Sequence, residues 1–153
     1  MGLIIDTNVL ICAERGRQSV DFSCWAEHGD AFISAITASE LLMGVHRADS
    51  EGRRVRRSAF VEAVLDTIPV LEFGLEAARI HARITAWLAT RGELIGPHDL
   101  LIAATALSRG FPVVTGNVKE FRRVPGLRCL RWSDPAIPAT GNVTTWRCGE
   151  RPD

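Results

Sequence analysis

Short apolar runs alternate with longer amphipathic segments along most of the chain. The apolar runs end at polar or turn-forming residues, as buried strands do, and they predict strands at 3–5, 31–33, 68–71, 112–115 and 127–132. Helical spacing of apolar residues predicts helices at 7–13, 20–27, 53–66, 75–90, 97–108 and 117–122, and another that follows 31–33 and has Glu40 in its first turn. Strands that alternate with helices indicate an α/β fold with a mostly parallel five-stranded sheet.

The apolar positions also predict which face of each helix is buried. The helix after 31–33 is expected to turn Leu41, Leu42 and Val45 inward, and the helix at 53–66 to turn Phe60, Val61, Val64 and Leu65 inward. The helix at 75–90 is expected to be the longest, with a buried stripe of Leu75, Ala78, Ile80, Ile84 and Leu88.

The chain has the size of one domain, with 153 residues of which 46% are hydrophobic. Residues 1–133 are expected to form this domain, because the periodicity is lost afterwards, and residues 134–153 are expected to be an irregular tail. The four cysteines fit no zinc or C-x-x-C spacing, no apolar run is long enough to span a membrane, and the first residues do not resemble a signal peptide. These features indicate a cytoplasmic protein that does not enter membranes.

The charges balance, with 18 basic and 18 acidic side chains. A protein that coats nucleic acid is usually strongly basic, so this class is disfavoured, whereas an enzyme with an acidic site is not. Lys119 is the only lysine, and the other 17 basic residues are arginines. Arginine suits phosphate contacts, although an arginine-rich genome explains the same bias.

Polar side chains follow the predicted strands at the edge of the sheet where ligands bind in α/β folds. Asp6 comes directly after 3–5, Glu40 is expected in the first turn of the helix after 31–33, Asp99 lies just inside the helix at 97–108, and Asn117 follows 112–115. Three carboxylates at one edge would repel one another unless a cation joined them, and oxygen ligands suit Mg²⁺ or Mn²⁺.

Each of these residues also has an explanation that involves no ligand. Asp6 and Asn117 are suitable helix N-caps, Asp99 would complement a helix dipole, and Thr37 with Glu40 matches a capping box. The shared edge of the sheet favours the cation site over four separate caps.

Four segments resemble the motifs of PIN-domain nucleases. They are residues 6–10 (DTNVL), 36–44 (ITASELLMG), 99–106 (DLLIAATA) and 114–121 (VTGNVKEF), and the resemblance spans residues 2 to about 132 in the expected order. Within this family, the single-domain form resembles the VapC toxins of bacterial VapBC toxin–antitoxin modules.

The resemblance implies a three-layer α/β/α fold, often as a homodimer, and hydrolysis of RNA that depends on Mg²⁺ or Mn²⁺. It implies that Asp6, Glu40 and Asp99 are catalytic and metal-binding residues, and that a VapB-type antitoxin blocks the active-site groove. Asn8, Thr115 and Asn117 are implied in substrate positioning. Many relatives carry Asp where this chain carries Asn117, so a second metal is in question, and Glu120 is an alternative fourth ligand.

Several assignments stay open on sequence alone. Thr115 is expected either to hydrogen-bond a metal-bound water or to position Asn117, or to be an ordinary strand-end hydroxyl. The basic run of Arg53, Arg54, Arg56 and Arg57 is either a solvated helix face or a contact for RNA or antitoxin. His98 is expected to be an ordinary polar surface residue, with tuning of the site as the alternative.

Two other classes of function compete with the nuclease. A catalytically silent PIN-fold interaction module is favoured by Asn117, and a metal titration with an RNA cleavage assay would separate it from an enzyme. A phospho-acceptor signalling domain is disfavoured because Glu72, after the run at 68–71, stands where an acceptor Asp would be needed. No phosphate-binding glycine loop follows the first strand.

Overall fold

A computed structural model describes residues 1–16 and 23–132 of the chain. Its strands are β1 (Gly2–Ile5), β2 (Asp30–Ser34), β3 (Val70–Leu71), β4 (Val113–Thr115) and β5 (Cys129–Arg131). Its helices are α1 (Thr7–Gly16), the 3₁₀ helix η1 (Ser23–His28), α2 (Ala35–His46), α3 (Glu51–Thr67), α4 (Leu75–Thr90), α5 (Pro97–Arg109) and α6 (Val118–Phe121).

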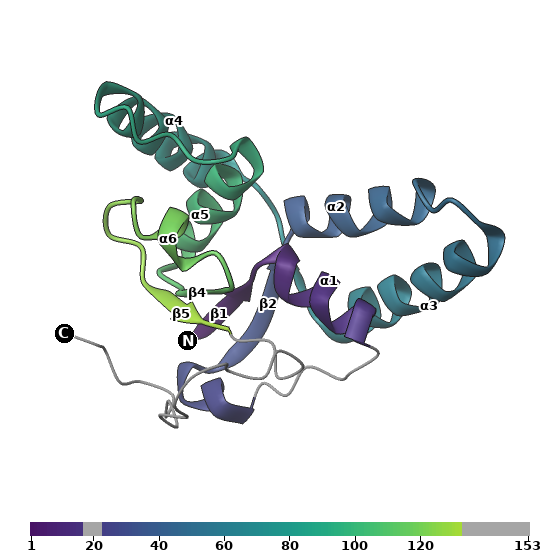
Figure 1. The fold of residues 1–153 in the computed structure, drawn as a ribbon. Helices are drawn as coiled ribbons and strands as arrows, with labels where there is room; N and C mark the ends of the chain where they lie inside the picture. Colours follow the sequence, from purple (N-terminus) through teal and green to yellow (C-terminus); the bar gives the residue numbers. More distant parts are fainter. Residues whose placement is uncertain (17–22, 133–153) are drawn as a thin grey trace, which may run out of the picture.

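The five strands form one parallel sheet in the order β3-β2-β1-β4-β5 (Figure 1). Strand β1 lies at the centre, where Leu3 pairs with Ala31 of β2 and Ile5 pairs with Val114 of β4. The chain first builds outward from β1 to β2 and β3, and then returns to place β4 on the other side. This reversal between β1 and β4 is the kind of position where α/β sheets bind ligands.

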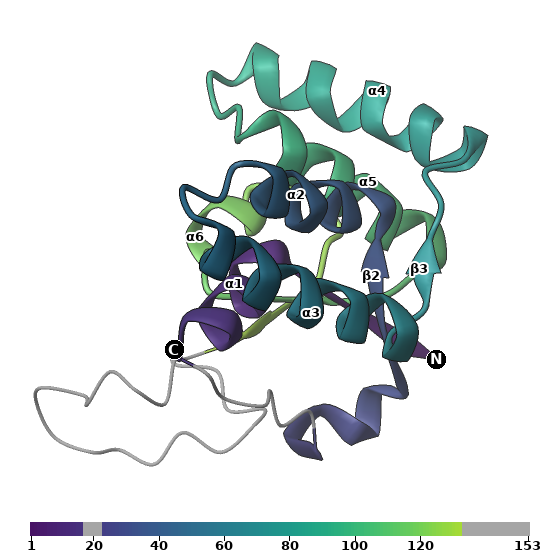
Figure 2. The ribbon, with the colours of Figure 1, turned by 90° about the vertical axis from the view of Figure 1, so that its right-hand side faces the viewer.

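Helices cover both faces of the sheet and create two apolar cores (Figure 2). Leu3 and Ile5 face the core formed with α1, α2 and α3, whereas Ile4 faces the core formed with α4, α5 and α6. The alternation within β1 therefore places apolar side chains in both cores, as a strand at the centre of a three-layer fold requires. The predicted α/β/α architecture is confirmed.

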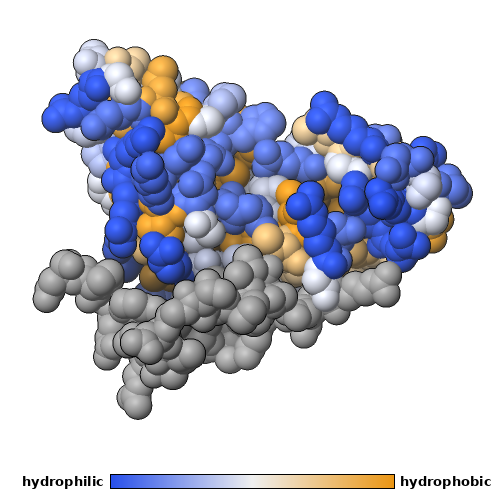
Figure 3. Space-filling model, in the orientation of Figure 1, coloured by the Kyte–Doolittle hydropathy of each residue, from blue (hydrophilic) through white to orange (hydrophobic). Residues whose placement is uncertain are grey.

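Helix pairs project from the sheet as two hairpins, α2–α3 and α4–α5 (Figure 1). The space-filling view shows them as two separate lobes with largely hydrophilic surfaces (Figure 3). Because α4 and α5 are antiparallel, the end of α4 lies at the same end of the hairpin as the first turn of α5. Among the described residues, no helix combines the length and apolar character needed to cross a bilayer.

Some sequence predictions about elements and faces are wrong. Helix α3, with 17 residues, is longer than α4, with 16. Leu75 is 71% exposed because it lies in the first turn of α4, and Ala77 replaces Ala78 on the buried stripe because it stands three residues before Ile80. Leu42 is 37% exposed because it points away from the core face that Leu41 occupies.

The segment predicted as a helix at 20–27 is described only in part. Its visible portion is the 3₁₀ helix η1 rather than an α-helix, and residues 17–22 lie outside the described residues. The predicted tail at 134–153 also lies outside them, so the boundary of the domain at residue 133 stays a prediction.

Candidate active site

Asp6 is the buried centre of the candidate site. It follows β1 directly and is only 3% exposed. Its Oδ2 accepts a 2.6 Å hydrogen bond from the Thr115 hydroxyl at the end of β4. Burial raises the pKa of the Asp6 carboxyl above its usual value, the hydrogen bonds from Thr115 and the Thr7 backbone oppose this, and the nearby Glu40 charge adds to it.

Glu40 approaches from α2 and is held at both carboxylate oxygens. The Thr7 hydroxyl donates a short hydrogen bond to Oε2, and His98 Nδ1 lies 2.7 Å from Oε1. The Thr7 hydroxyl also contacts the buried hydroxyl of Thr37 at 3.2 Å. Three elements thereby fix one acid, since Thr7 begins α1, Glu40 belongs to α2 and His98 belongs to α5.

The capping-box interpretation of Thr37 and Glu40 is wrong. Ser34 is the N-cap of α2, and its hydroxyl accepts a 3.0 Å hydrogen bond from the Thr37 backbone N–H. Glu40 therefore lies in the second turn of α2 rather than the first. The side chain is free of any capping role, because the cap is already satisfied three residues before Thr37.

Asp99 lies in the first turn of α5 and is half-buried. Its pKa is raised to about 6, first by burial and then by the negative charges of Asp6, Glu120 and Glu40, with a small opposing effect from His98. The carboxylates predicted from sequence therefore interact electrostatically, and Glu120 of α6 joins them. His98 is exposed, as expected of a polar surface residue, and it also contacts Glu40.

Thr115 connects the end of β4 to the start of α1. Besides donating to Asp6, its hydroxyl accepts hydrogen bonds from the backbone N–H of Asn117 at 2.9 Å and from Asn8 Nδ2 at 3.5 Å. The Asn8 side-chain oxygen in turn accepts from the Gly116 backbone N–H at 3.3 Å. Asn117 occupies the N-cap position of α6, but its side chain makes no capping hydrogen bond. The Asn117 amide is therefore not used to cap α6.

The donor set suits a hard divalent cation. Within residues 1–16 and 23–132, no three His, Cys, Asp or Glu side chains lie close enough together to enclose an ion by themselves. Mg²⁺, however, usually binds through one or two carboxylates and keeps several waters. Burial and neighbouring charge penalise ionised Asp99, and a cation beside Asp6 and Asp99 would relieve that penalty. The residues therefore fit Mg²⁺ or Mn²⁺.

Sequence reasoning gave no role to Thr7 or Ser34, and it gave Thr37 only the role of a helix cap. Thr7 precedes Asn8 in the first motif and Thr37 lies in the second, so their position within the motifs was the available signal. The contacts between α1 and α2 could not be read from spacing, because residues 7 and 40 are brought together only by the sheet.

The arginine run on α3 is engaged largely in contacts within the chain. Arg53 pairs with Asp49 at 2.8 Å, Arg54 pairs with Glu51 at 3.5 Å, and Arg57 pairs with Glu14 at 3.5 Å. Arg57 also donates to the Gly44 carbonyl at 2.8 Å. The geometry fits the solvated helix face better than a free phosphate-binding patch.

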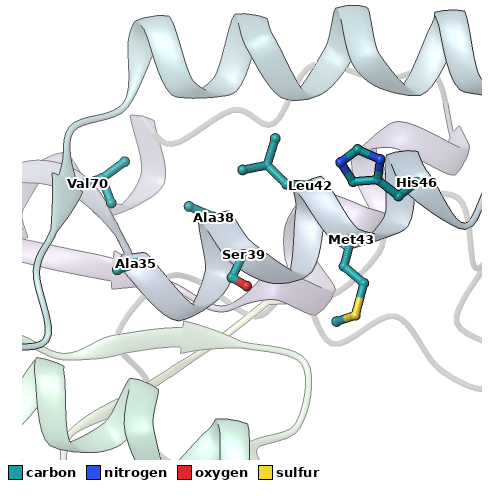
Figure 4. A pocket seen from close by; sticks show the side chains of 7 residues that line it. All are labelled: Ala35, Ala38, Ser39, Leu42, Met43, His46 and Val70. Atoms are coloured by element: carbon teal, nitrogen blue, oxygen red, sulfur yellow. The ribbon is translucent and has the colours of Figure 1, made fainter.

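An open pocket of about 500 Å³ lies along α2, separate from the acids (Figure 4). Its lining is mainly apolar and comprises Ala35, Ala38, Ser39, Leu42, Met43, His46 and Val70. The exposed Leu42 projects from α2 among these side chains (Figure 4). Such a lining suits apolar side chains and offers no cationic cluster for phosphate.

Comparison with known proteins gives one consistent result. The PIN domain model matches residues 3–127. Ribonuclease VapC1 of Rickettsia felis is 45% identical over 130 residues, which cover 85% of this chain and 96% of the relative. The tRNA(fMet)-specific endonuclease VapC of Shigella flexneri is 36% identical over 131 residues, which cover 85% and 97%.

Solved structures agree with this result. DNA-bound VapBC from Salmonella typhimurium superposes with a TM-score of 0.75 at 33% identity, over 87% of this chain and 99% of the matched chain. VapBC2 from Rickettsia felis, at 24% identity and a TM-score of 0.78, shows the same fold over 87% and 100%.

The chain belongs to the PIN-domain family. Its relatives within that family are VapC ribonucleases that it matches over nearly their whole length, so the prediction of a VapC-type nuclease, a hydrolase, is confirmed.

Proposed function

We propose that this protein is the toxin of a toxin–antitoxin module and cleaves RNA at the site formed by Asp6, Glu40 and Asp99 with Mg²⁺ or Mn²⁺. The observation that carries the proposal is the convergence of acids from the end of β1, from α2 and from α5 at one edge of the sheet, in a chain related to VapC ribonucleases. Burial and the charges of Asp6, Glu120 and Glu40 raise the pKa of Asp99, in agreement with this convergence. The ionised carboxylates repel one another at neutral pH, and a divalent cation bound between them would offset this repulsion.

Each acid has a proposed role. Asp6, fixed by Thr115, and Asp99, at the first turn of α5, are the direct ligands. Glu40 has both oxygens engaged by Thr7 and His98, and it therefore orients the attacking water or binds the cation through water. A bound divalent ion supplies an activated water and polarises a phosphoryl oxygen. Asn117 and Asn8 are proposed to position the substrate, and Glu120 is the alternative fourth ligand.

The proposed partners follow from the family. Relatives crystallised as VapBC complexes support a VapB-type antitoxin, and the pocket on α2 is proposed to receive its apolar side chains because it lies on the helix that carries Glu40. By resemblance to the family, we also propose that the protein forms a homodimer and acts in the cytoplasm. Two relatives named as tRNA(fMet)-specific endonucleases make that tRNA the first substrate to test.

Purified Asp6→Asn and Asp99→Asn variants should lose RNA cleavage, by about 100-fold or more if each acid binds the catalytic metal. Both should retain the circular dichroism spectrum of the wild type. The assay uses tRNA(fMet) and total RNA with Mg²⁺ or Mn²⁺, and Glu62→Gln, an exposed acid of α3, is the matched control. Full activity in both variants would reject the site, and a wild type that binds Mn²⁺ but cuts no RNA would favour a silent interaction module.

A further inference from the structure

A line of basic and aromatic side chains runs along the outer face of α4. Arg79, Arg83, Trp87 and Arg91 recur at intervals of four residues, so they follow one side of the helix from its first half to its C-cap. All four are exposed, with Trp87 at 37%. The neighbouring side of α4, about 100° around the helix because each residue turns it by that angle, packs into the core through Ala77, Ile80, Ile84 and Leu88. These four side chains, together called the α4 arginine face, are therefore not needed for packing against the core.

The arginines of this face lack the local neutralisation seen on α3. Within the described ranges, no ion pair involves Arg79, Arg83 or Arg91, whereas three of the four arginines of the α3 run pair with acids of the chain. The only acid of α4 itself, Glu76, stands in its first turn, at the end opposite Arg91. Exposed Glu76 and Glu93 flank the helix, so the three arginines outnumber the nearby acids by one, in a chain that is neutral as a whole.

Trp87 and Arg91 form a flat exposed unit. The guanidinium carbon of Arg91 lies 4.1 Å from the centroid of the indole ring, which is a cation–π contact. An indole and a guanidinium plane are both surfaces on which nucleic-acid bases stack. Arginines that alternate with such a platform match the alternation of phosphate and base along a single strand.

The C-terminal end of the α4 arginine face is joined by a short loop to the helix that carries Asp99. Residues 92–96 connect Arg91 directly to the first turn of α5, which carries Asp99. Arg123, just after α6, donates to the Leu94 carbonyl at 3.4 Å and so adds another cation beside this connection. Figure 2 shows α4 as the outermost helix on its side of the sheet, where no other described element covers it.

We propose that the α4 arginine face binds the part of a single-stranded RNA that extends beyond the cleaved bond. This inference rests on the proposed function, because it assigns the surface that guides substrate to Asp99. The arginines contact phosphates, and the Trp87–Arg91 pair stacks a base. The proposal therefore places the main RNA contact on α4, and not on the run of Arg53, Arg54, Arg56 and Arg57 on α3.

The test measures RNA binding without cleavage. Fluorescence anisotropy of a 5′-fluorescein-labelled 12-nucleotide RNA of mixed sequence is followed in EDTA at several salt concentrations. Arg83→Ala/Arg91→Ala should weaken binding about tenfold or more, and the slope of log K against log salt should fall by about 0.7 for each lost phosphate contact. Trp87→Leu should weaken binding about tenfold, whereas Trp87→Phe should bind nearly as wild type does.

Arg53→Ala/Arg54→Ala is the matched control, because it removes the same charge from exposed arginines that are already paired. It should bind RNA nearly as tightly as the wild type. The single variants Arg83→Gln and Arg91→Gln repeat the test if the double variant does not fold.

Three results would overturn the proposal. The α4 variants could bind as the wild type does, the α3 control could lose as much affinity, or the α4 variants could change only the oligomeric state in sedimentation, which would make the face a protein interface. Where the wild type still cleaves RNA with Mn²⁺ in these cases, the proposed function stands and only the α4 assignment fails. A wild type that neither binds nor cleaves RNA would overturn both.

Discussion

At the scale of single residues, the buried carboxylates of the candidate site lower the stability of the folded protein. Asp6 is buried and Asp99 half-buried, although a carboxylate is most stable in water. Thr115 compensates in part by donating to Asp6, and Thr7 and His98 hold Glu40. Burial, followed by the negative charges of Asp6, Glu120 and Glu40, raises the pKa of Asp99 to about 6. This is the residue at which protonation, metal binding and folding stability are most directly linked.

Asp99→Asn should stabilise the metal-free protein near pH 7.5 and have little effect near pH 4. A raised folded pKa of about 6 means that, between pH 3.8 and 6, the folded state keeps a proton that the unfolded state has lost. Stability therefore falls as pH rises through this window, and the neutral amide avoids the loss. After allowance for solvent screening the gain is on the order of 1 kcal/mol, or about 2–4 °C in Tm.

Thermal unfolding in EDTA across this pH range measures the effect. Glu62→Gln, which removes an exposed charge from α3, should show no such pH-dependent difference from the wild type. If Asp99→Asn were instead less stable than the wild type at pH 7.5, the Asp99 carboxylate would have to be favourably solvated or paired in the folded state, and not strained by its acidic neighbours.

At the scale of elements, the predictions from sequence succeeded where the interacting residues are close in the sequence, and failed where they are far apart. Leu3, Ile4 and Ile5 predict a buried strand because the signal is local, and Pro97 and Gly110 correctly bracket α5. The start of α2 was misplaced because Ser34 and Thr37 are both good N-caps, and only tertiary structure shows Thr37 turned toward Thr7. The contact of His98 with Glu40 joins two helices 58 residues apart, and spacing carries no signal for it.

Ser34→Ala should destabilise the protein more than Ser50→Ala does. Both serines are N-caps, of α2 and α3, but Ser34 is fully buried and also contacts Thr37 at 3.1 Å, whereas Ser50 caps an exposed helix end. Loss of a cap costs about 0.5–2 kcal/mol, and a buried unsatisfied N–H places Ser34 at the upper end of that range.

Urea unfolding of the two variants compares these caps. Because α2 carries Glu40, Ser34→Ala should also lower cleavage activity, while Ser50→Ala should not. Equal losses of stability in the two variants would contradict the special importance of Ser34, and would favour Thr37 as the N-cap of α2.

At the scale of the whole molecule, the order of the sheet explains why distant motifs form one site. Asp6 and Thr115 end neighbouring central strands, and the helices that carry Glu40 and Asp99 start at the same edge. The four motifs could be recognised in the sequence, and with them the acids. The charged face of α4 could not, because the sequence alone does not show that three α3 arginines are paired while those of α4 form no ion pair within residues 1–16 and 23–132.

Binding of a divalent ion at this edge should stabilise the entire fold. A ligand that binds only the folded state adds RT ln(1 + [L]/Kd), which is about 2.7 kcal/mol at a hundredfold excess over Kd. For a domain of this size, that corresponds to a Tm increase of about 5–10 °C with Mn²⁺. The increase should continue with the logarithm of Mn²⁺ concentration, because the ion binds only the folded chain, in which the acids are brought together.

The same titration with Asp6→Asn/Asp99→Asn should give almost no increase, and Glu62→Gln should respond as the wild type does. The double variant should also start from a higher Tm at pH 7.5, since it lacks two strained carboxylates. The wild type would therefore be the less stable protein in EDTA and the more stable one in Mn²⁺. If the two curves ran parallel at all Mn²⁺ concentrations, the ion would bind elsewhere, and the acids would have to act without it.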